Sequence, residues 1–277
     1  MKLLNLGCGT SHHPDWINID FESNHAEVIA CNLLGGIPYP DDFFDVVYHS
    51  HVLEHFPRAE ADKFLAHCFR VLKKGGLLRV VVPDLENIVK CYLEKLQQCL
   101  DGVTSANDEY DWIMLELYDQ VTRNRSGGEM ADFLVNCQPD KRNFIQSRIG
   151  AEAENFWAPV DPSTTLKPAG KILQKLRSGK IFHILRQKTA YWLVYLIAGK
   201  TSASGFSSGV FRANGEIHQW MYDRFSLERL LKQQGFIEVR ICKTGESDIP
   251  DFSRYALDQS DGQARKPDSL YIEAKKP

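Results

Sequence analysis

The order of apolar and polar positions predicts strands that alternate with helices or loops over the first 85 residues. Short apolar or alternating runs indicate strands at 2–6, 16–21, 27–31, 44–49 and 77–82. The run 44–49 is nearly unbroken, which is typical of a strand covered on both faces. This alternation favours an α/β fold built on a parallel sheet.

Two helices follow from the same analysis. Apolar residues recur at i, i+3 and i+4 from Ala61 to Leu72, which predicts a helix with Pro57 in its first turn. Two lysines followed by Gly75 and Gly76 indicate its end. A second amphipathic helix is expected over 85–100, with Asp84 as its N-cap.

The strand pattern fades from 101 to 215 and then returns. Helices are expected at 111–121, 130–135, 171–176 and 181–197, followed by a Ser- and Gly-rich loop at 199–215. The last part predicts a helix over 225–234 with Ser226 as N-cap, and strands at 236–243 and 270–275. We therefore expect a sheet domain made of 1–85 and 216–277, interrupted by a helical insertion, 86–215.

Composition narrows the class of protein. Hydrophobic residues make up 43% and charged residues 25%, the balance of a globular protein. A net charge of −3 excludes a generally basic protein that coats nucleic acid. The seven cysteines are scattered without a C-x-x-C pair, and the sequence opens without a secretory pattern. These features predict reduced thiols, no thiolate zinc site and a cytoplasmic location.

Charge is unevenly distributed along the chain. Residues 162–215 contain nine Lys or Arg and no Asp or Glu, which leaves 24 basic against 36 acidic residues elsewhere. Within it, 171–200 alternates cations with apolar and aromatic residues. Three interpretations stay open: a lid packed on the core, a peripheral contact with anionic lipid, or a phosphate-recognising surface.

The first strand runs directly into the turn Gly7-Cys8-Gly9, where an open α/β sheet binds its ligands. A dinucleotide site requires a third glycine, but His12 occupies that position. It also requires an acidic residue about 20 positions on, whereas Asp20 comes earlier. The turn therefore argues against a nicotinamide cofactor.

Several segments together resemble class I S-adenosylmethionine-dependent methyltransferases. They are the turn motif 3–10, the strand 17–20 ending in Asp20, the stretch 32–47 and the motif His51-Val52-Leu53-Glu54-His55. The resemblance implies a Rossmann-like, mostly parallel seven-stranded sheet with an antiparallel last strand, and a large helical insertion after the fifth strand. It also implies S-adenosylmethionine as cofactor, bound by Asn5, Gly7, Cys8, Gly9, Asp20, Asn32, Leu33 and Ser50.

Two departures from the family pattern affect the expected cofactor pocket. The segment 10–15 leaves no room for the helix that normally separates the first two strands, so we expect an open pocket that the insertion closes. Asn32 stands where the family has an adenine-contacting Asp, although an amide oxygen can also accept a hydrogen bond. Asp20 keeps the carboxylate that the resemblance assigns to the ribose hydroxyls.

Candidate catalytic groups come from two places in the chain. His218 lies where the chain re-enters the sheet domain and is the first choice for a general base; His51 lies nearest the donor. The motif from His51 to His55 also matches H-x-x-E-H, but Pro57 interrupts the helix that a zinc site needs, so no metal is expected. Residues expected to contact the acceptor are Glu116, Asp119, Arg123 and Tyr222.

The preferred function is methyl transfer to a small-molecule or glycan acceptor, through a hydroxyl oxygen, with the insertion as a lid. A glycan acceptor implies a role in polysaccharide or nucleotide-sugar metabolism, and an aromatic or lipid acceptor is the alternative within the class. Two other classes stay open: a nicotinamide-dependent oxidoreductase or epimerase, and a non-catalytic membrane-associated binding protein on the same fold.

Overall fold

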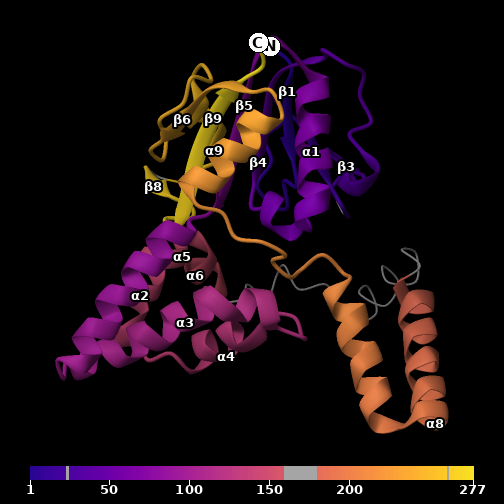
Figure 1. The fold of residues 1–277 in the computed structure, drawn as a ribbon, viewed down its shortest axis with the longest axis vertical. Coiled ribbons are helices and arrows are strands. Elements are labelled where there is room, and N and C mark those ends of the chain that lie inside the picture. Colours follow the sequence, from indigo (N-terminus) through magenta and orange to yellow (C-terminus); the bar gives the residue numbers. More distant parts are fainter. Residues whose placement is uncertain (23–24, 159–179, 261) are drawn as a thin grey trace.

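The computed structural model describes residues 1–22, 25–158, 180–260 and 262–277, and its main feature is a mixed seven-stranded sheet (Figure 1). The sheet runs in the order β3-β2-β1-β4-β5-β9-β6. Strand β9 runs antiparallel to the other strands of this sheet. The predicted Rossmann-like sheet is confirmed, and its strands are β1 (Leu3–Leu6), β2 (Ile17–Asp20), β3 (Val28–Ala30), β4 (Phe44–Ser50), β5 (Leu72–Pro83), β6 (Ile237–Cys242) and β9 (Ser269–Lys275).

The two faces of the sheet are covered differently. Helices α1 (Arg58–Val71) and α9 (Arg224–Gln233) lie on one face and bury a large apolar core against it (Figure 1). The other face is covered by loops, because a loop replaces the helix between β1 and β2. Aromatic side chains fill that layer, among them Trp16, Tyr48 and Tyr255.

The insertion has a core of its own. Five helices, joined by short 3₁₀ turns, pack around the fully buried Trp112 beside the end of β5 (Figure 1). They are α2 (Leu85–Leu100), α3 (Asn107–Thr122), α4 (Gly128–Asn136), α5 (Arg142–Ile149) and α6 (Ala151–Trp157). Asp84 caps α2 as predicted, since its carboxylate accepts from the backbone N–H groups of Glu86 and Asn87.

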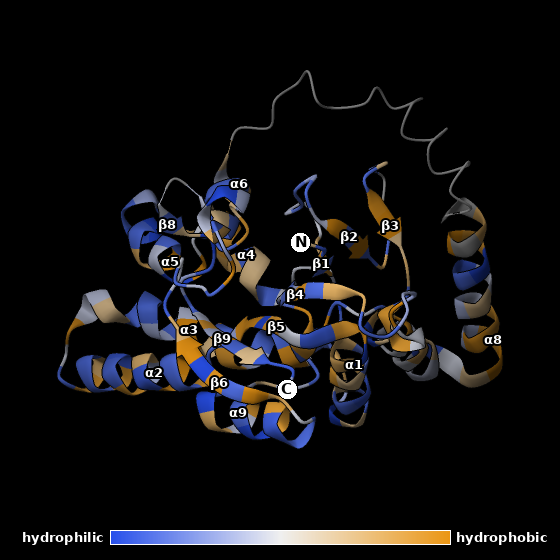
Figure 2. Cartoon of the chain, turned by 90° about the horizontal axis from the view of Figure 1, so that it is seen from above, coloured by the Kyte–Doolittle hydropathy of each residue, from blue (hydrophilic) through white to orange (hydrophobic). Residues whose placement is uncertain are grey.

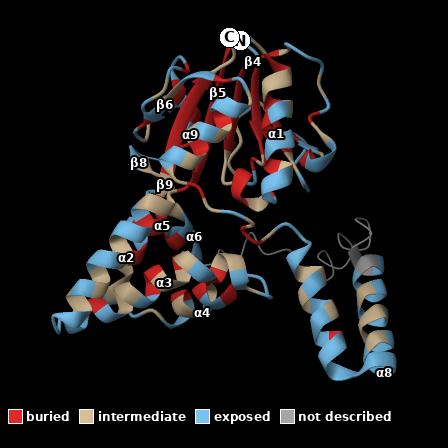
Figure 3. Ribbon diagram, in the orientation of Figure 1, coloured by how far each residue is buried: buried red, intermediate tan, exposed pale blue. Residues whose placement is uncertain are grey.

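The prediction of a loop over 199–215 is wrong. Helix α8 (Lys180–Arg212) continues through most of it, with one non-helical residue, Gly199 (φ +80°). No proline interrupts the segment after Gly199, and the fully buried Ala203 shows that its small residues allow close packing. Figure 3 shows that both arms of α8 are otherwise largely exposed. The helix expected at 171–176 lies outside the described residues.

Two predicted helix ends also differ. Asp223, not Ser226, is the N-cap of α9; Ser226 is its reciprocal partner three residues later in a capping box. Helix α1 ends at Val71, before the lysines, because Leu72 is buried and already pairs with Phe44 of β4. A small hairpin, β7 (Gln259–Ser260) and β8 (Gln263–Ala264), was not expected.

Candidate functional site

The turn after β1 requires glycine. Gly7 and Gly9 both have positive φ, +62° and +52°. A Cβ atom at Gly7 would lie 2.2 Å from Cγ2 of Val52, so no side chain fits there. The N–H of Gly9 donates to Asp20 Oδ2 at 2.7 Å. The turn is thereby fixed against the end of β2, with its backbone exposed to a ligand.

Asn5 shapes the loop that follows the turn. Its side chain is buried, and its amide donates to the carbonyl of Ser11 at 3.0 Å and to Asn18 Oδ1 at 3.1 Å. These hydrogen bonds fix the path of the loop 10–15, which replaces the helix that normally separates the first two strands. The role of Asn5 is therefore to position the glycine turn.

A first cavity of about 270 Å³ lies over this turn. Its walls come from three distant segments: the turn with Ser50 and His51, helix α6, and the loops before β9. Residues of the insertion therefore line part of this pocket. The lining includes Asn5, Gly7, Cys8, Gly9, Ser50, His51, Ala151, Glu152, Asn155, Leu257, Arg265 and Lys266.

Three predicted cofactor residues lie outside the lining of this cavity. Asp20 lies behind the turn, bound to the Gly9 N–H. The Oδ1 of Asn32 accepts from the N–H of Leu34 and caps a short 3₁₀ turn (Leu33–Gly35). Leu33 packs into the sheet core. A nucleoside that reaches Asp20 would therefore extend past the glycine turn.

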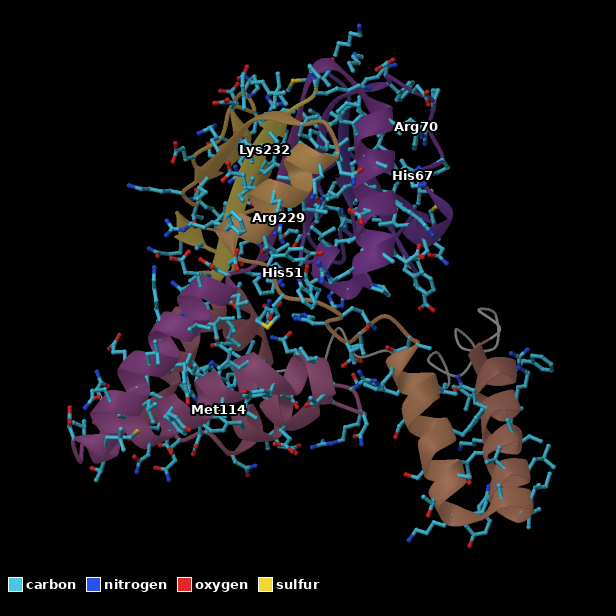
Figure 4. All side chains as sticks on the ribbon, in the orientation of Figure 1. His51, His67, Arg70, Met114, Arg229 and Lys232 are labelled. Carbon is cyan, nitrogen blue, oxygen red and sulfur yellow. The ribbon has the colours of Figure 1, made fainter. Side chains whose placement is uncertain are left out.

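A second cavity, of about 390 Å³, lies between the sheet and the insertion. His51, Glu152 and Lys266 line both cavities, so the two spaces meet beside His51. Figure 4 shows His51 at the junction of the sheet domain and the helical insertion. Further residues of the second cavity are His55, Gln120, Arg123, Met130, Leu134, Phe156, Glu216, His218 and Asp268.

His51 is held by contacts on both ring nitrogens. Nε2 lies 2.8 Å from Ser269 Oγ, and Nδ1 lies 3.3 Å from Glu54 Oε1. Glu54 is completely buried. Burial raises the pKa of Glu54, but the neighbouring imidazole of His51 outweighs this effect, and the pKa falls to about 2. The sequence analysis assigned no role to Glu54. A carboxylate within an apolar stretch was the signal that could have identified it as a buried charge.

His218 is buried beside a second imidazole. Its side chain is 5% exposed, and its ring meets the ring of His55 edge-on at 4.8 Å. Burial lowers the pKa of His218 to about 3, although the Glu54 carboxylate acts in the opposite direction. The ring is therefore neutral at physiological pH and is a weak base in this environment.

The residues predicted to contact an acceptor divide into two groups. Glu116 is buried in an ion pair with Arg148 (2.6 Å) and also accepts from the indole of Trp112. Asp119 accepts from the N–H of Glu129 and caps α4. Tyr222 lies in the core between sheet and helices. Of the four, Arg123 lines the second cavity.

The glycine turn, strand order and His51 motif agree with a family match. The profile described as "Methyltransferase domain" matches residues 4–80. Residues 4–80 thus carry the sequence pattern of a methyltransferase domain. The match supports S-adenosylmethionine as the cofactor, and the uncovered backbone of the glycine turn fits a nucleoside ligand.

Individual proteins match the chain over short segments. It is 33% identical over 88 residues to "Ubiquinone/menaquinone biosynthesis C-methyltransferase UbiE" of Vibrio campbellii, which is 32% of this chain and 29% of that protein. The protein of the same name from Vibrio parahaemolyticus is 44% identical over 59 residues, 20% and 22% of the two chains. The chain thus spans less than a third of the length of these curated relatives.

Two solved structures are similar over nearly the whole chain at low identity. A SAM-dependent methyltransferase from Archaeoglobus fulgidus is 12% identical with a TM-score of 0.38, covering 99% of this chain and 86% of that one. A possible histamine N-methyltransferase from Thermotoga maritima is 11% identical with a TM-score of 0.39, covering 100% and 82%.

Proposed function

We propose that this chain transfers the methyl group of S-adenosylmethionine to a hydroxyl oxygen of a small-molecule or glycan acceptor. The donor occupies the first cavity and the acceptor the second. The observation that carries this proposal is the position of His51, which lines both cavities and has a buried carboxylate, Glu54, beside its ring.

When bound, the cofactor supplies an electrophilic methyl group, and the residues of the chain align the acceptor and accept its proton. Alignment alone contributes roughly 7–11 kcal/mol in favourable cases. His51 is a better candidate for the base than His218, because Glu54 orients its ring at the meeting point of the cavities. The family match favours this chemistry over the nicotinamide alternative.

A hydroxyl-rich acceptor is favoured by the second cavity. Polar side chains line it from both the insertion and the sheet domain, among them Gln120, Arg123 and Glu216. Arg123 Nη1 lies 3.3 Å from Glu216 Oε1, so this cation and its partner carboxylate can both reach sugar hydroxyls. Apolar residues of α4 complete the cavity and can pack on a sugar ring.

Calorimetry and a methyl-transfer assay test the proposal. We expect the full chain to bind S-adenosylmethionine and its demethylated product, and Asp20→Ala to weaken both. When sugars, phenols and lipids are each offered as acceptors, we expect methyl transfer to the sugars. His51→Asn should lower kcat by about 10²–10⁴-fold with little change in cofactor affinity, whereas the control His67→Asn on α1 should change neither. Absence of cofactor binding to the wild type contradicts the proposal.

We also propose that α8 contacts an anionic membrane surface peripherally. Several large apolar side chains of α8 are exposed, including Trp192, Leu196 (77%) and Ile197 (84%). Figure 2 shows apolar stretches along the arm of α8 that it labels. No acidic residue accompanies its cations, and within the described residues no helix is long and apolar enough to cross a bilayer. An exposed apolar helix with this charge is typical of interfacial binding.

A further inference from the structure

We propose that Glu54, His55 and His218 form a binding site for one divalent transition-metal ion at the wall of the second cavity. Glu54 and His55 come from the 3₁₀ turn after β4 (Leu53–His55), and His218 comes from the segment that returns from the insertion. The role of the ion in catalysis rests on the proposed function; its binding does not.

The three side chains are close enough to share an ion. One donor atom from each residue can be chosen so that all three lie within 4.8 Å of one another. Donors around a zinc ion, with bonds of about 2.0–2.1 Å, lie about 3.3 Å apart in tetrahedral geometry. Glu54 Oε1 and His55 Nε2 are already 4.0 Å apart. Rotation of the side chains would bring the donors to bonding distance.

The carboxylate of Glu54 makes no well-aligned hydrogen bond within the described residues, and the His51 imidazole beside it is the contact that lowers its pKa. The carboxylate is fully buried, and His51 Nδ1 lies 3.3 Å from its Oε1. A buried charge without a hydrogen-bonding partner is costly, and such groups in proteins are normally paired or coordinate a metal. Its surroundings are imidazole rings, which are themselves metal ligands.

The tautomer of His55 also favours a metal ion at this place. Its Nδ1 lies 3.2 Å from the carbonyl oxygen of Ile217, which only accepts, so the proton belongs on Nδ1. In the neutral ring the lone pair on Nε2 then faces the Glu54 carboxylate at 4.0 Å. Two lone-pair carriers facing each other repel, and a cation between them removes the repulsion. Metal-binding histidines commonly donate their other N–H to a backbone carbonyl in this way.

Two imidazoles and one carboxylate suit zinc, manganese or iron and leave coordination positions open. His55 and His218 both line the second cavity, so an open position faces the acceptor. An acceptor hydroxyl bound there becomes more acidic and loses its proton to His51. Its oxygen then forms a bond to the methyl carbon as the carbon–sulfur bond breaks, and the electron pair of that bond returns to sulfur.

Metal titration of the full chain tests the site directly. After chelation and dialysis, we expect Zn²⁺ to bind with one-to-one stoichiometry by calorimetry, and Co²⁺ to give visible d–d absorption. His55→Gln and His218→Gln should each weaken Zn²⁺ binding at least tenfold. His67→Gln is the matched control, because His67 lies on α1 away from the junction that His51 marks (Figure 4). Circular dichroism establishes that each variant is folded.

The outcomes separate this inference from the proposed function. No Zn²⁺ or Co²⁺ binding to the wild type, or equal losses in the control, overturns the metal site. Metal-free protein that still binds S-adenosylmethionine but transfers methyl only after Zn²⁺ or Mn²⁺ is restored supports the catalytic role. Undiminished transfer by the metal-free protein overturns that role and leaves the transferase proposal intact.

Discussion

Gly7 and Gly9 share a backbone conformation but differ in what surrounds them. Both have positive φ, yet a Cβ at Gly7 would collide with Val52, while a Cβ at Gly9 would meet nothing within 4 Å. We expect Gly9→Ala to lose about 1–2 kcal/mol of stability from backbone strain alone. Gly7→Ala should lose more, since Val52 must also move. Urea unfolding of the two variants measures the difference; equal losses would contradict the steric argument.

His49 makes stability depend on pH. Its ring is fully buried in β4, neither nitrogen has a hydrogen-bond partner, and it packs edge-on against Phe64. Burial lowers the pKa of His49 to about 4, which the Glu54 carboxylate opposes only in part. The unfolded chain therefore binds a proton that the folded chain excludes between about pH 6.5 and pH 4, and stability falls as the pH falls through this window.

A variant without the imidazole isolates this contribution. From the two pKa values, His49 should account for about 2 kcal/mol of the stability lost between pH 7 and pH 5. His49→Leu should show a correspondingly smaller loss when unfolding by urea is compared at the two pH values. An unchanged pH dependence in this variant would show that the imidazole is not the responsible group.

Single residues were predictable where a backbone rule decides them. The glycine turn and the Asp84 cap follow from local chemistry, and both are present. The partners of Glu116 and Asp119 were not predictable, because Arg148 and the start of α4 are brought to them by packing between helices. A polar helix face in a sequence does not distinguish a ligand-binding wall from an internal ion pair.

At the scale of elements, α8 carries more exposed large apolar side chains than any other helix described. Leu196 and Ile197 directly precede its kink at Gly199 and are among its most exposed side chains. If α8 docks on lipid, these residues enter the bilayer interface. Burial of each apolar side chain there contributes roughly 1.5–3 kcal/mol to the free energy of binding. Replacing both by glutamate should lower vesicle binding more than tenfold.

Vesicle sedimentation checks this expectation. The wild type should pellet with vesicles containing phosphatidylglycerol and much less with pure phosphatidylcholine, and the anionic binding should weaken with salt. Val135→Glu, at an equally exposed apolar position on α4, is the control and should bind as the wild type does. A wild type that stays in the supernatant, or a control that loses binding equally, would contradict membrane docking.

Strands were easier to predict than the helices of the second half. Runs such as 44–49 are apolar because the strand is covered on both faces, so sequence and burial agree. The segment after Gly199 misled because serine and glycine disfavour helix formation, yet the helix continues through them to Arg212 with Ala203 buried.

At the scale of the whole molecule, the functional site is assembled from segments far apart in the chain. The two cavities take residues from the first strand's turn, from α6 and from the loops before β9, and they meet at His51. The sequence predicted the glycine turn and the strands around it, because those motifs are local. It could not predict that Glu54, His55 and His218 converge, because that arrangement depends on how the insertion returns.

The insertion leaves and re-enters the sheet domain at one point. Asp84 and Tyr222 form a β-bridge there, and the N–H of Leu85 donates to the carbonyl of Tyr222 at 2.9 Å. Replacing the residues between Asp84 and Tyr222 by another insertion would leave every strand pairing of the seven-stranded sheet in place. If the proposed function holds, a different insertion would change the acceptor while rebuilding only the part of the first cavity that α6 lines. We expect a chimaera joined at these two residues to keep the sheet domain and to take its acceptor specificity from the new insertion.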